Sequence, residues 1–397
     1  MIELHPRIEA ISPSLIRKVF AAAPPGCLNM GLGQPDLPVP EPVVEAVRKT
    51  LEGGMAPYSL NAGHLALRAS IADMYARWGA QGAGVGGWIE PEGVIITSGV
   101  QEGLFVALSA LCGPGDEILV PDPGFPAYAM IAQAIGVGAR TYACGAARGF
   151  RPRAEAIEAA LGPKVRAVVI SAPGNPTGAL ADPKDLEEIC ALLDARGVAW
   201  VSDEIYDRFT YEGQFCSPSA ASQEGIVLSG LSKSANMMGW RLGWMAAPRR
   251  LAVGLTATHQ IVNTCASTLA QAAAQVAVEG LCGRGPAVGA IEANVAIFKE
   301  RRDRAVKALA DLGLSHAPAE GAFYIFVDVR PHLRGGEDDL GLCMRMLQEV
   351  GLIAIPGQGF GEGGRGWVRL ATTTGEVEEG VRRLGQGLGL VSGAGGA

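Results

Sequence analysis

The stretch RAVVISAPGNPTGALADPKDLEEICALLDARGVAWVSDEIYDRF, residues 166–209, is the part of this chain that is most informative about its fold. It begins with the apolar run RAVVIS (166–171), passes through a turn-rich loop into a helical pattern over 183–195, and returns to a second apolar run, VAWVS (198–202). Two short β-rich runs joined by a helix indicate parallel strands with a helical crossover. Runs as continuously apolar as AVVI are typical of strands buried on both faces.

The same alternation extends along much of the chain. Further strand-like runs occur at 93–97 (GVIIT), 116–120 (DEILV) and 226–228 (IVL), with helical patterns between them. After about residue 285 the pattern changes to a long charged helix over 290–311, followed by FYIFVDV (323–329). We therefore expect an α/β fold with a mostly parallel sheet, followed by a smaller α+β domain that the extended N-terminal segment joins.

Composition excludes several classes of protein. The 397 residues include 33 Lys and Arg against 40 Asp and Glu, a net charge of −7 without a run of five like charges, so we expect no nucleic-acid partner. The 8 cysteines form no CxxC pair and no zinc spacing, which favours free thiols in a reducing cytoplasm and no metal site. We find neither a signal peptide nor an apolar stretch of the ~20 residues that a membrane span needs, so we expect no membrane partner.

A second informative segment is SGLSKSANMMGWRLGW (229–244), in which a single lysine, Lys233, lies among small polar residues after a strand. A lysine that is shielded from water beside a fixed cation has a lowered pKa, and its neutral amine can attack a carbonyl carbon to form a Schiff base. Arg241 is such a cation, and its fork also suits phosphate. Taken by itself the segment fits an exposed loop lysine better, so the function of Lys233 depends on the neighbouring loops.

Three loops that follow predicted strands carry complementary groups. APGNPTG contains Asn175, VSDEIYDRF contains Asp203 and Tyr206, and TSGVQEG places Gly99 at the start of a helix whose N-terminus favours an anion. Each group also has an ordinary structural explanation, because Asn175 fits a turn, Asp203 a helix cap and Gly99 a plain strand-to-helix turn.

Taken together, these loops match one ligand, because ligands of open α/β sheets bind at the carboxyl ends of the strands. The Gly99 turn and Arg241 suit a phosphate, and Asp203 suits a protonated ring nitrogen. Asn175 and Tyr206 suit a phenolic oxygen, Lys233 suits an aldehyde, and Phe125, in the loop after DEILV, suits the face of an aromatic ring. The cofactor with these features is pyridoxal 5′-phosphate (PLP).

With these motifs in order, the chain resembles the class I aminotransferases, the fold-type-I PLP enzymes related to aspartate aminotransferase, from about Pro6 to Leu390. The resemblance implies a large PLP-binding domain (46–288) with a mostly parallel seven-stranded sheet flanked by helices. It also implies a smaller α+β domain formed by an N-terminal arm (1–45) and the C-terminal part (289–397). The implied activity is the transfer of an amino group between an L-amino acid and a 2-oxo acid by a ping-pong mechanism.

The family's roles carry over to the matching positions of this chain. Lys233 corresponds to the lysine that holds the cofactor as an aldimine and later shuttles the proton, and Asp203 to the partner of the pyridine N–H. Asn175 and Tyr206 correspond to the pair that binds the 3′-oxygen. The other implied cofactor contacts are a stacking ring, a backbone phosphate cradle and the residues that clamp the phosphate: Phe125, Gly99, Val100, Gln101, Ser232 and Arg241.

Three further positions concern the substrate and the partner subunit. Arg369 in GWVRLA matches the arginine that grips the substrate α-carboxylate, although alone it fits a structural salt bridge, and Gly33 and Asn175 match further substrate contacts. Tyr58 in PYSLNAGHLALR matches a tyrosine that reaches the phosphate of the neighbouring subunit's cofactor, although alone it fits a packed surface aromatic. The match implies a homodimer with shared active sites.

The chain also departs from the family pattern. Gly230 stands where many relatives have a phosphate-binding serine, so either Ser229 or Ser232 replaces it or the backbone cradle and Arg241 suffice. We cannot place a second arginine for a distal carboxylate, which disfavours a strict aspartate or glutamate preference. The main alternative activity is that of a PLP-dependent carbon–sulfur β-lyase or related eliminating enzyme, since those enzymes share the scaffold and cofactor residues.

Overall fold

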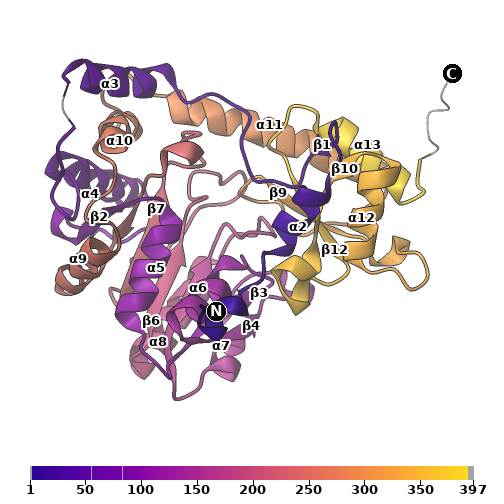
Figure 1. Cartoon of the computed structure of the whole chain (residues 1–397), viewed down its shortest axis with the longest axis horizontal. Helices are drawn as coiled ribbons and strands as arrows, with labels where there is room; N and C mark the ends of the chain where they lie inside the picture. Colours follow the sequence, from indigo (N-terminus) through magenta and orange to yellow (C-terminus); the bar gives the residue numbers. More distant parts are fainter. Residues whose placement is uncertain (1, 55, 83, 392–397) are drawn as a thin grey trace.

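A sheet of seven strands forms the centre of the computed structural model, which describes residues 2–54, 56–82 and 84–391 (Figure 1). The strand order is β2-β8-β7-β6-β5-β3-β4, and every neighbouring pair is parallel except the two that involve β8. The strands are β2 (Val94–Thr97), β3 (Glu117–Asp122), β4 (Gly138–Ala143), β5 (Val165–Ser171), β6 (Ala199–Asp203), β7 (Gly225–Gly230) and β8 (Gly243–Ala246). The expected α/β fold with a mostly parallel seven-stranded sheet is confirmed.

Two of these strands are absent from the sequence prediction. β4 lies at the edge of the sheet and exposes most of its residues, so it lacks the continuous apolar run that marks a buried strand. β8 is fully buried but only four residues long, and it lies at the end of a segment whose glycines and polar residues resemble a loop.

Helices cover both faces of the sheet because successive strand residues point to opposite sides. In β5, Val169 packs into one apolar core while Val168 and Ile170 pack into the other. The first core includes residues of α5 (Val100–Leu111), α6 (Ala127–Ile135) and α9 (Arg249–Asn263). The second includes residues of α3 (Glu41–Glu52), α4 (Leu65–Ala80), α7 (Ala154–Ala160), α8 (Pro183–Arg196) and α10 (Thr268–Leu281).

A second, smaller group of strands lies beside this sheet. β9 (Tyr324–Asp328), β11 (Ile355–Pro356) and β12 (Trp367–Ala371) form an antiparallel sheet in the order β11-β12-β9. The helices of this region are α11 (Ala290–Asp311), α12 (Asp339–Glu349) and α13 (Val377–Gly387), and α11 has the bounds that the sequence predicts.

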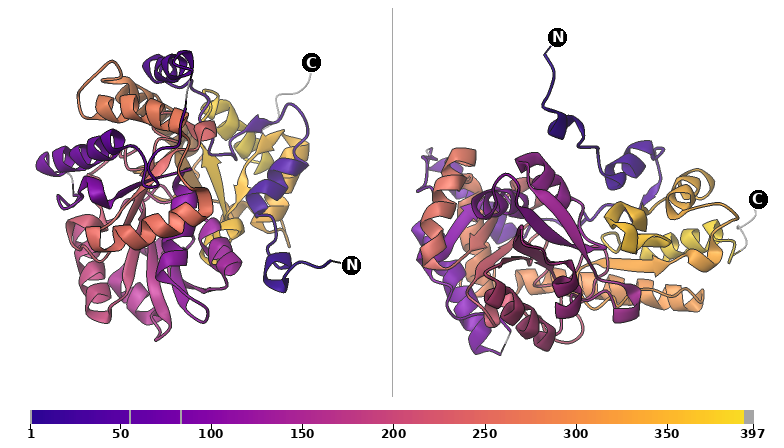
Figure 2. Two further views of the ribbon diagram at one scale, coloured as in Figure 1. Left: turned by 60° about the vertical axis from the view of Figure 1, so that its left-hand side comes forward. Right: turned by 90° about the horizontal axis from the view of Figure 1, so that it is seen from below.

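The N-terminal segment packs against this smaller region. β1 (Leu28–Asn29) pairs in parallel with β10 (Leu352–Ile353), and Figure 2 shows the indigo segment running beside the yellow one. The two N-terminal helices, α1 (Pro6–Glu9) and α2 (Leu15–Ala22), precede this strand, and α2 contacts β11. Residues from both ends of the chain therefore meet next to the larger sheet.

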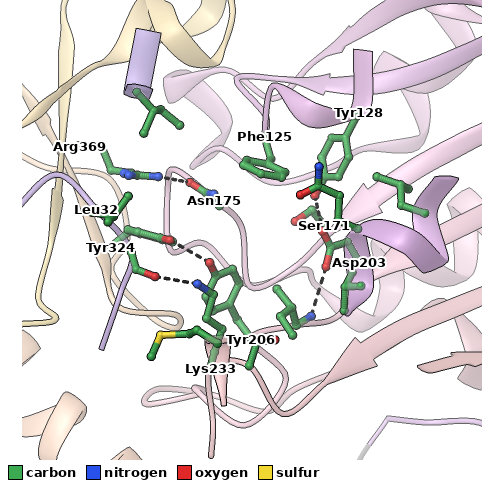
Figure 3. Close-up of a pocket in the computed structure, with 18 of the residues that line it drawn as sticks. Leu32, Phe125, Tyr128, Ser171, Asn175, Asp203, Tyr206, Lys233, Tyr324 and Arg369 are labelled. Atoms are coloured by element: carbon green, nitrogen blue, oxygen red, sulfur yellow. Dashed lines mark hydrogen bonds between the residues drawn. The ribbon is translucent and has the colours of Figure 1, made fainter. Parts of the chain in front are cut away.

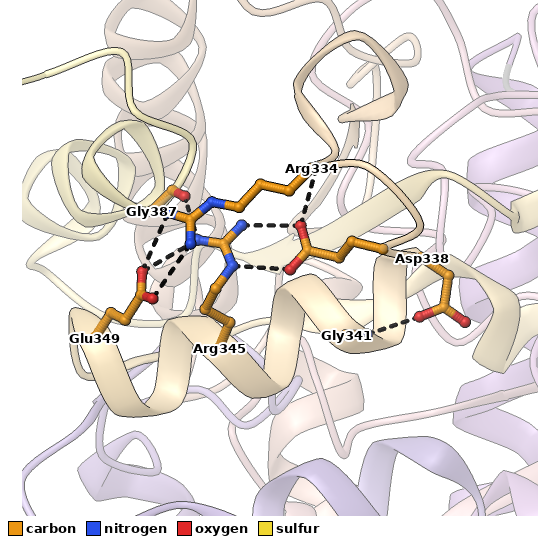
Figure 4. A network of polar contacts seen from close by, with 7 residues as sticks. Arg334, Asp338, Gly341, Arg345, Glu349 and Gly387 are labelled. Atoms are coloured by element: carbon orange, nitrogen blue, oxygen red, sulfur yellow. Dashed lines mark hydrogen bonds and ion pairs between the residues drawn. The ribbon is translucent and has the colours of Figure 1, made fainter.

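An arginine network fastens α12 to α13. Arg345 Nε and Nη2 donate to the two carboxylate oxygens of Glu337 at 2.8 and 3.0 Å, and Arg345 Nη1 donates to the carbonyl of Gly387 at 2.7 Å (Figure 4). A bidentate pair of this kind fixes the orientation of both side chains. The network joins α12 and Glu337, which precedes it, to the end of α13.

The described residues contain no helix long and apolar enough to cross a membrane. Within the same residues, no group of three or more metal-ligating side chains gathers. All 8 cysteines are free thiols.

Candidate active site

A cavity of ≈ 260 Å³ lies at the carboxyl ends of the central strands, where the larger sheet faces β9 and β12 (Figure 3). Ser171 and Asp203 end β5 and β6, Lys233 follows β7, and Arg369 comes from β12. The cavity gathers most of the residues singled out in the sequence: Gly33, Val100, Gln101, Phe125, Asn175, Asp203, Tyr206, Ser232, Lys233, Arg241 and Arg369.

The amine of Lys233 lies inside this cavity. Its Nζ donates to the carbonyl of Gly33 at 2.6 Å and lies 5.8 Å from the centre of the Phe323 ring. Burial lowers the pKa of Lys233 to about 8, and the positive charges of Arg369 and Arg241 add to this effect while Asp203 opposes it. Roughly a tenth of Lys233 is therefore a neutral, nucleophilic amine at pH 7, far more than for a lysine with the usual pKa.

Asp203 is a buried carboxylate with a phenol as its partner. Its Oδ2 accepts a hydrogen bond from the Tyr128 hydroxyl at 2.8 Å, and its Oδ1 accepts one from the Ile205 amide at 3.3 Å. Burial raises the pKa of Asp203, and these two hydrogen bonds oppose the rise. A cationic N–H placed in the cavity beside this carboxylate would be strongly stabilised.

Arg369 is a buried cation whose partners are uncharged. Its side chain is 2 % exposed, its Nη1 donates to Asn175 Oδ1 at 2.8 Å, and its Nη2 donates to the carbonyl of Gly31 at 2.5 Å. The guanidinium lies 4.3 Å from the Tyr324 ring centre, and Nε has no hydrogen-bond partner among the described residues. Arg369 thus resembles a binding site for an anionic group more than a structural salt bridge.

Two tyrosines close the side of the cavity near Gly33. The hydroxyls of Tyr206 and Tyr324 are 2.8 Å apart and share a hydrogen bond. A Cβ on Gly33 would lie 1.9 Å from the Tyr324 hydroxyl, so residue 33 must be glycine for the chain to approach this closely.

Arg241 packs directly against the start of α5, and both line the cavity. Gly99 caps α5 with φ of +84°, and a Cβ there would lie 2.5 Å from Arg241 Nη2. Arg241 is held by its own hydrogen bonds to the carbonyls of Met238 at 2.9 Å and Ser98 at 3.4 Å. The amides of Val100 and Gln101, in the first turn, have no acceptor within the helix, so they are available to an anion.

Of the two serines that could replace a phosphate-binding serine at position 230, only Ser232 lines the cavity. The Ser229 hydroxyl donates to Asp207 Oδ2 at 2.9 Å in the interior, whereas Ser232 lines the cavity. A Cβ on Gly230 would lie 2.8 Å from Gly243 Cα and 2.9 Å from the Leu242 carbonyl oxygen. Serine at position 230 would therefore collide with β8.

Tyr58 lies outside this cavity. Its side chain is 86 % exposed and does not line the site of its own chain. The loop that carries it is tied to the end of α9, because Asn61 Nδ2 donates to the carbonyl of Thr264 at 2.8 Å.

Sequence reasoning missed several residues that line the cavity. The most important are Tyr128, which bonds Asp203, and Tyr324, which bonds Tyr206. Tyr128 lies three residues after the predicted site residue Phe125, and Tyr324 lies in the run FYIFVDV, so aromatic residues close to predicted site residues are a usable signal. Ile16, Leu32 and Met238 also line the cavity and carry no chemical signal in the sequence.

The chain is similar to known aminotransferases along most of its length. Residues 25–384 match the family model described as "Aminotransferase class I and II". The chain is 32% identical to aromatic-amino-acid aminotransferase 2 of Thermococcus litoralis, covering 96% of this chain and 97% of that protein. It is 33% identical to the probable N-acetyl-LL-diaminopimelate aminotransferase of Bacillus subtilis, with 96% and 94% covered. Among solved structures, a mutant of the Thermus thermophilus aspartate aminotransferase superposes with a TM-score of 0.88 at 29% identity, covering 98% of this chain and 100% of that one.

Proposed function

This chain belongs to the class I and II aminotransferase family, and on that premise we propose which of its residues perform the transfer and which substrates they select. It is a PLP-dependent aminotransferase that acts on an amino acid and a 2-oxo acid. Lys233, buried between Asp203 and Arg369 in one cavity, is the observation that carries the proposal for the site.

The donor set fits PLP. The proposed phosphate site is the part of the cavity that Arg241 lines together with Val100 and Gln101, in the first turn of α5. Asp203 would face the ring nitrogen, Asn175 and Tyr206 the ring oxygen, and Phe125 the ring face. When bound, the cofactor supplies an acceptor for the electron pair that the substrate Cα releases.

Lys233 is the proposed proton carrier. Its Nζ, neutral after substrate binding, removes the proton from the substrate Cα and then returns a proton as general acid. The cations of Arg369 and Arg241 favour the neutral amine, and Asp203 limits this effect. The hydrogen bond that Tyr128 donates to Asp203 stabilises the ionised carboxylate of Asp203, which lines the cavity.

Arg369 and Asn175 are the proposed α-carboxylate site. A guanidinium fork binds a carboxylate through two parallel hydrogen bonds, which orients the Cα–H bond toward Lys233. The aromatic rings of Tyr324 and Phe360, 4.3 and 4.9 Å from the guanidinium carbon, hold the fork in place.

The pKa of Lys233 predicts how cofactor uptake depends on pH. Only the neutral amine attacks the aldehyde, so PLP uptake by the cofactor-free protein should become faster as the pH rises through about 8 and level off above it. Stopped-flow absorbance between pH 6 and 10 measures this rate. A midpoint near 10.5, the usual value for lysine, would contradict the proposed environment of Lys233.

The substrate side chain is proposed to be apolar. A second cavity of ≈ 770 Å³ adjoins the first and shares Lys233 with it. Its large apolar side chains come from α2, α6 and the loops that follow β1, β3 and β7: Ile16, Phe20, Leu32, Phe125, Met130 and Met238. Arg17, which is exposed, is the one charged side chain besides Lys233 that lines it in the described part of the chain. A distal carboxylate would therefore have no buried partner there.

A panel of amino donors tests both the activity and this preference. When leucine, methionine or phenylalanine is added to the PLP-loaded enzyme, the visible absorbance of the cofactor should change with a second-order rate constant at least about 10-fold higher than with aspartate or glutamate. The reason is that each buried CH₂ contributes ~0.8 kcal/mol. Conversion by no amino acid would contradict aminotransferase activity. Preference for aspartate would contradict only the apolar pocket, and release of ammonia and pyruvate from cystathionine would favour the eliminating alternative.

A homodimer with shared sites is proposed from the surface around Tyr58. Exposed apolar side chains gather where the Tyr58 loop meets the end of α9, including Leu60, Ile261 at 87 % exposure and Val262. An apolar patch of this kind marks an interface, and Tyr58 would reach the partner's phosphate site from it. Sedimentation should give twice 41.1 kDa, and a monomer that retains full activity would contradict the proposal.

The domain limits 1–45, 46–288 and 289–397 also remain a proposal, supported by the pairing of β1 with β10. Limited proteolysis should cut near residue 288 and just before α3, because residue 45 itself lies inside that helix, and cuts confined to the middle of either part would contradict these limits. The cytoplasmic location stays a prediction from the sequence.

A further inference from the structure

A buried histidine outside the reaction path lies behind the proposed phosphate site. His259 on α9 is 0 % exposed, and its Nε2 lies 3.1 Å from Oε1 of Glu102, in the first turn of α5. Asn263, one helical turn further along α9, donates from Nδ2 to Oε2 of the same carboxylate at 3.2 Å. Two side chains on one face of α9 therefore contact one carboxylate of α5.

Glu102 connects this pair to the turn that begins α5. Its Oε2 accepts the amide hydrogen of Ser98 at 2.5 Å, an arrangement in which a glutamate in the first turn caps the start of its own helix. Burial alone would raise the pKa of Glu102, but His259 and the Ser98 amide outweigh it and the pKa is lowered. Glu102 is therefore an anion with three partners, from Ser98, His259 and Asn263.

Ser98 is held from three directions. Its amide donates to Glu102, its hydroxyl accepts from Asn263 Nδ2 at 2.6 Å, and its carbonyl accepts from Arg241 Nη2 at 3.4 Å. Gly99 follows directly with a positive φ, so the direction of the next amides depends on how Ser98 is fixed. The same Arg241 that is proposed to clamp the phosphate thus also contacts the turn that α9 supports.

The negative charge of Glu102 gives a second reason for the contact between Glu102 and His259. A carboxylate in the first turn of α5 would repel a phosphate bound at that helix N-terminus. His259 Nε2 contacts the Glu102 oxygen that does not bind Ser98, so both oxygens of this carboxylate have polar neighbours other than the bound phosphate.

We infer that His259 and Asn263 are positioning residues which, through Glu102, hold the Ser98–Gly99 turn in the shape that receives the cofactor phosphate. This inference rests on the proposed function, because it assumes that the phosphate binds at this turn. A purely structural role, in which the same contacts only pack α9 against α5, would weaken every ligand of the site equally.

Comparing PLP with pyridoxal, which lacks the phosphate, separates these roles. The cofactor-free protein is titrated with each compound while its visible absorbance is followed. His259→Leu should raise the Kd of PLP about 10-fold and leave the Kd of pyridoxal within about 2-fold, because Glu102 Oε1 would lose its polar neighbour from α9 and Glu102 would hold the turn less firmly. His259→Gln, which keeps an N–H where Nε2 lies, should restore PLP binding to within about 3-fold.

A control variant on α9 and the ³¹P spectrum of bound PLP distinguish a local effect of His259 from a general effect of mutation. Arg249→Ala, which changes an exposed residue at the other end of the same helix, should bind both compounds like the wild type. The ³¹P resonance of bound PLP should shift in His259→Leu and not in Arg249→Ala. If His259→Leu does not fold, Asn263→Ala takes its place with the same expected direction.

Two results would overturn the inference. One is unchanged PLP affinity in the folded His259 or Asn263 variant, and the other is an equal loss of PLP and pyridoxal binding. Failure of the wild-type protein to bind PLP would instead contradict the proposed function, so the two failures are distinguishable.

Discussion

Replacing Lys233 by alanine is expected to lower the rate of amino transfer by at least about 10³-fold, because the variant loses the group that acts as base and acid at the substrate Cα. Lys233 is the lysine whose amine lies in the cavity, and Asp203, Arg241 and Arg369 surround it there. Single-turnover absorbance with a saturating amino donor measures the loss after both proteins have been loaded with PLP.

The matched control is Lys184→Ala, which removes an exposed lysine from the first turn of α8. It should transfer amino groups at the wild-type rate. More than a tenth of wild-type activity in a folded Lys233→Ala protein would mean that another group carries the proton, and the proposed role of Lys233 would be wrong.

Replacing Arg369 by lysine is expected to lower kcat/KM for amino acids by about 10²-fold or more. Lysine keeps the positive charge but loses the planar fork that binds a carboxylate through two hydrogen bonds and packs against the Tyr324 ring. It also leaves Asn175 Oδ1 and the Gly31 carbonyl without a donor of the same geometry. Steady-state kinetics with the best donor from the panel measures the effect.

A primary amine without a carboxylate is the internal control for Arg369. It should react slowly and at a similar rate in wild type and Arg369→Lys, because it never uses the fork. Equal losses for the amine and the amino acid would assign Arg369 a structural role, the alternative that its sequence context favours when taken alone.

The sequence could predict those parts of the site that depend on one sheet. Asn175, Asp203 and Lys233 each follow a strand-like run, and the carboxyl ends of parallel strands meet at one edge. Arg369 could not be placed this way, since β12 belongs to another sheet and only its resemblance to a family motif links it to the site. Its two hydrogen-bond partners lie 194 and 338 residues away along the chain.

Contacts between distant residues account for most of what the sequence could not predict. Tyr128 and Asp203 are 75 residues apart, and Tyr206 and Tyr324 are 118 apart. Neither local periodicity nor turn chemistry reports such pairs. The same holds for Glu102 and His259, whose types and neighbours give no reason to join them until α5 and α9 pack side by side.

The reasons for individual glycines also depend on contacts that the sequence does not report. The 55 glycines are an obvious excess in the sequence, but their number alone does not tell a flexible loop from a close approach. At Gly33 and Gly99 the structure gives the reason, because a Cβ would collide with the Tyr324 hydroxyl or with the Arg241 guanidinium. Both glycines border the proposed cofactor and substrate site.

Borohydride reduction of the PLP-loaded protein, followed by mass mapping of its peptides, tests most directly whether Lys233 is the residue that binds the cofactor covalently. The expected result is one phosphopyridoxyl group per chain, on the peptide that contains Lys233, and no label in Lys233→Ala. Label on any of the other six lysines, or no label on a protein that has bound PLP, would contradict the central role of Lys233.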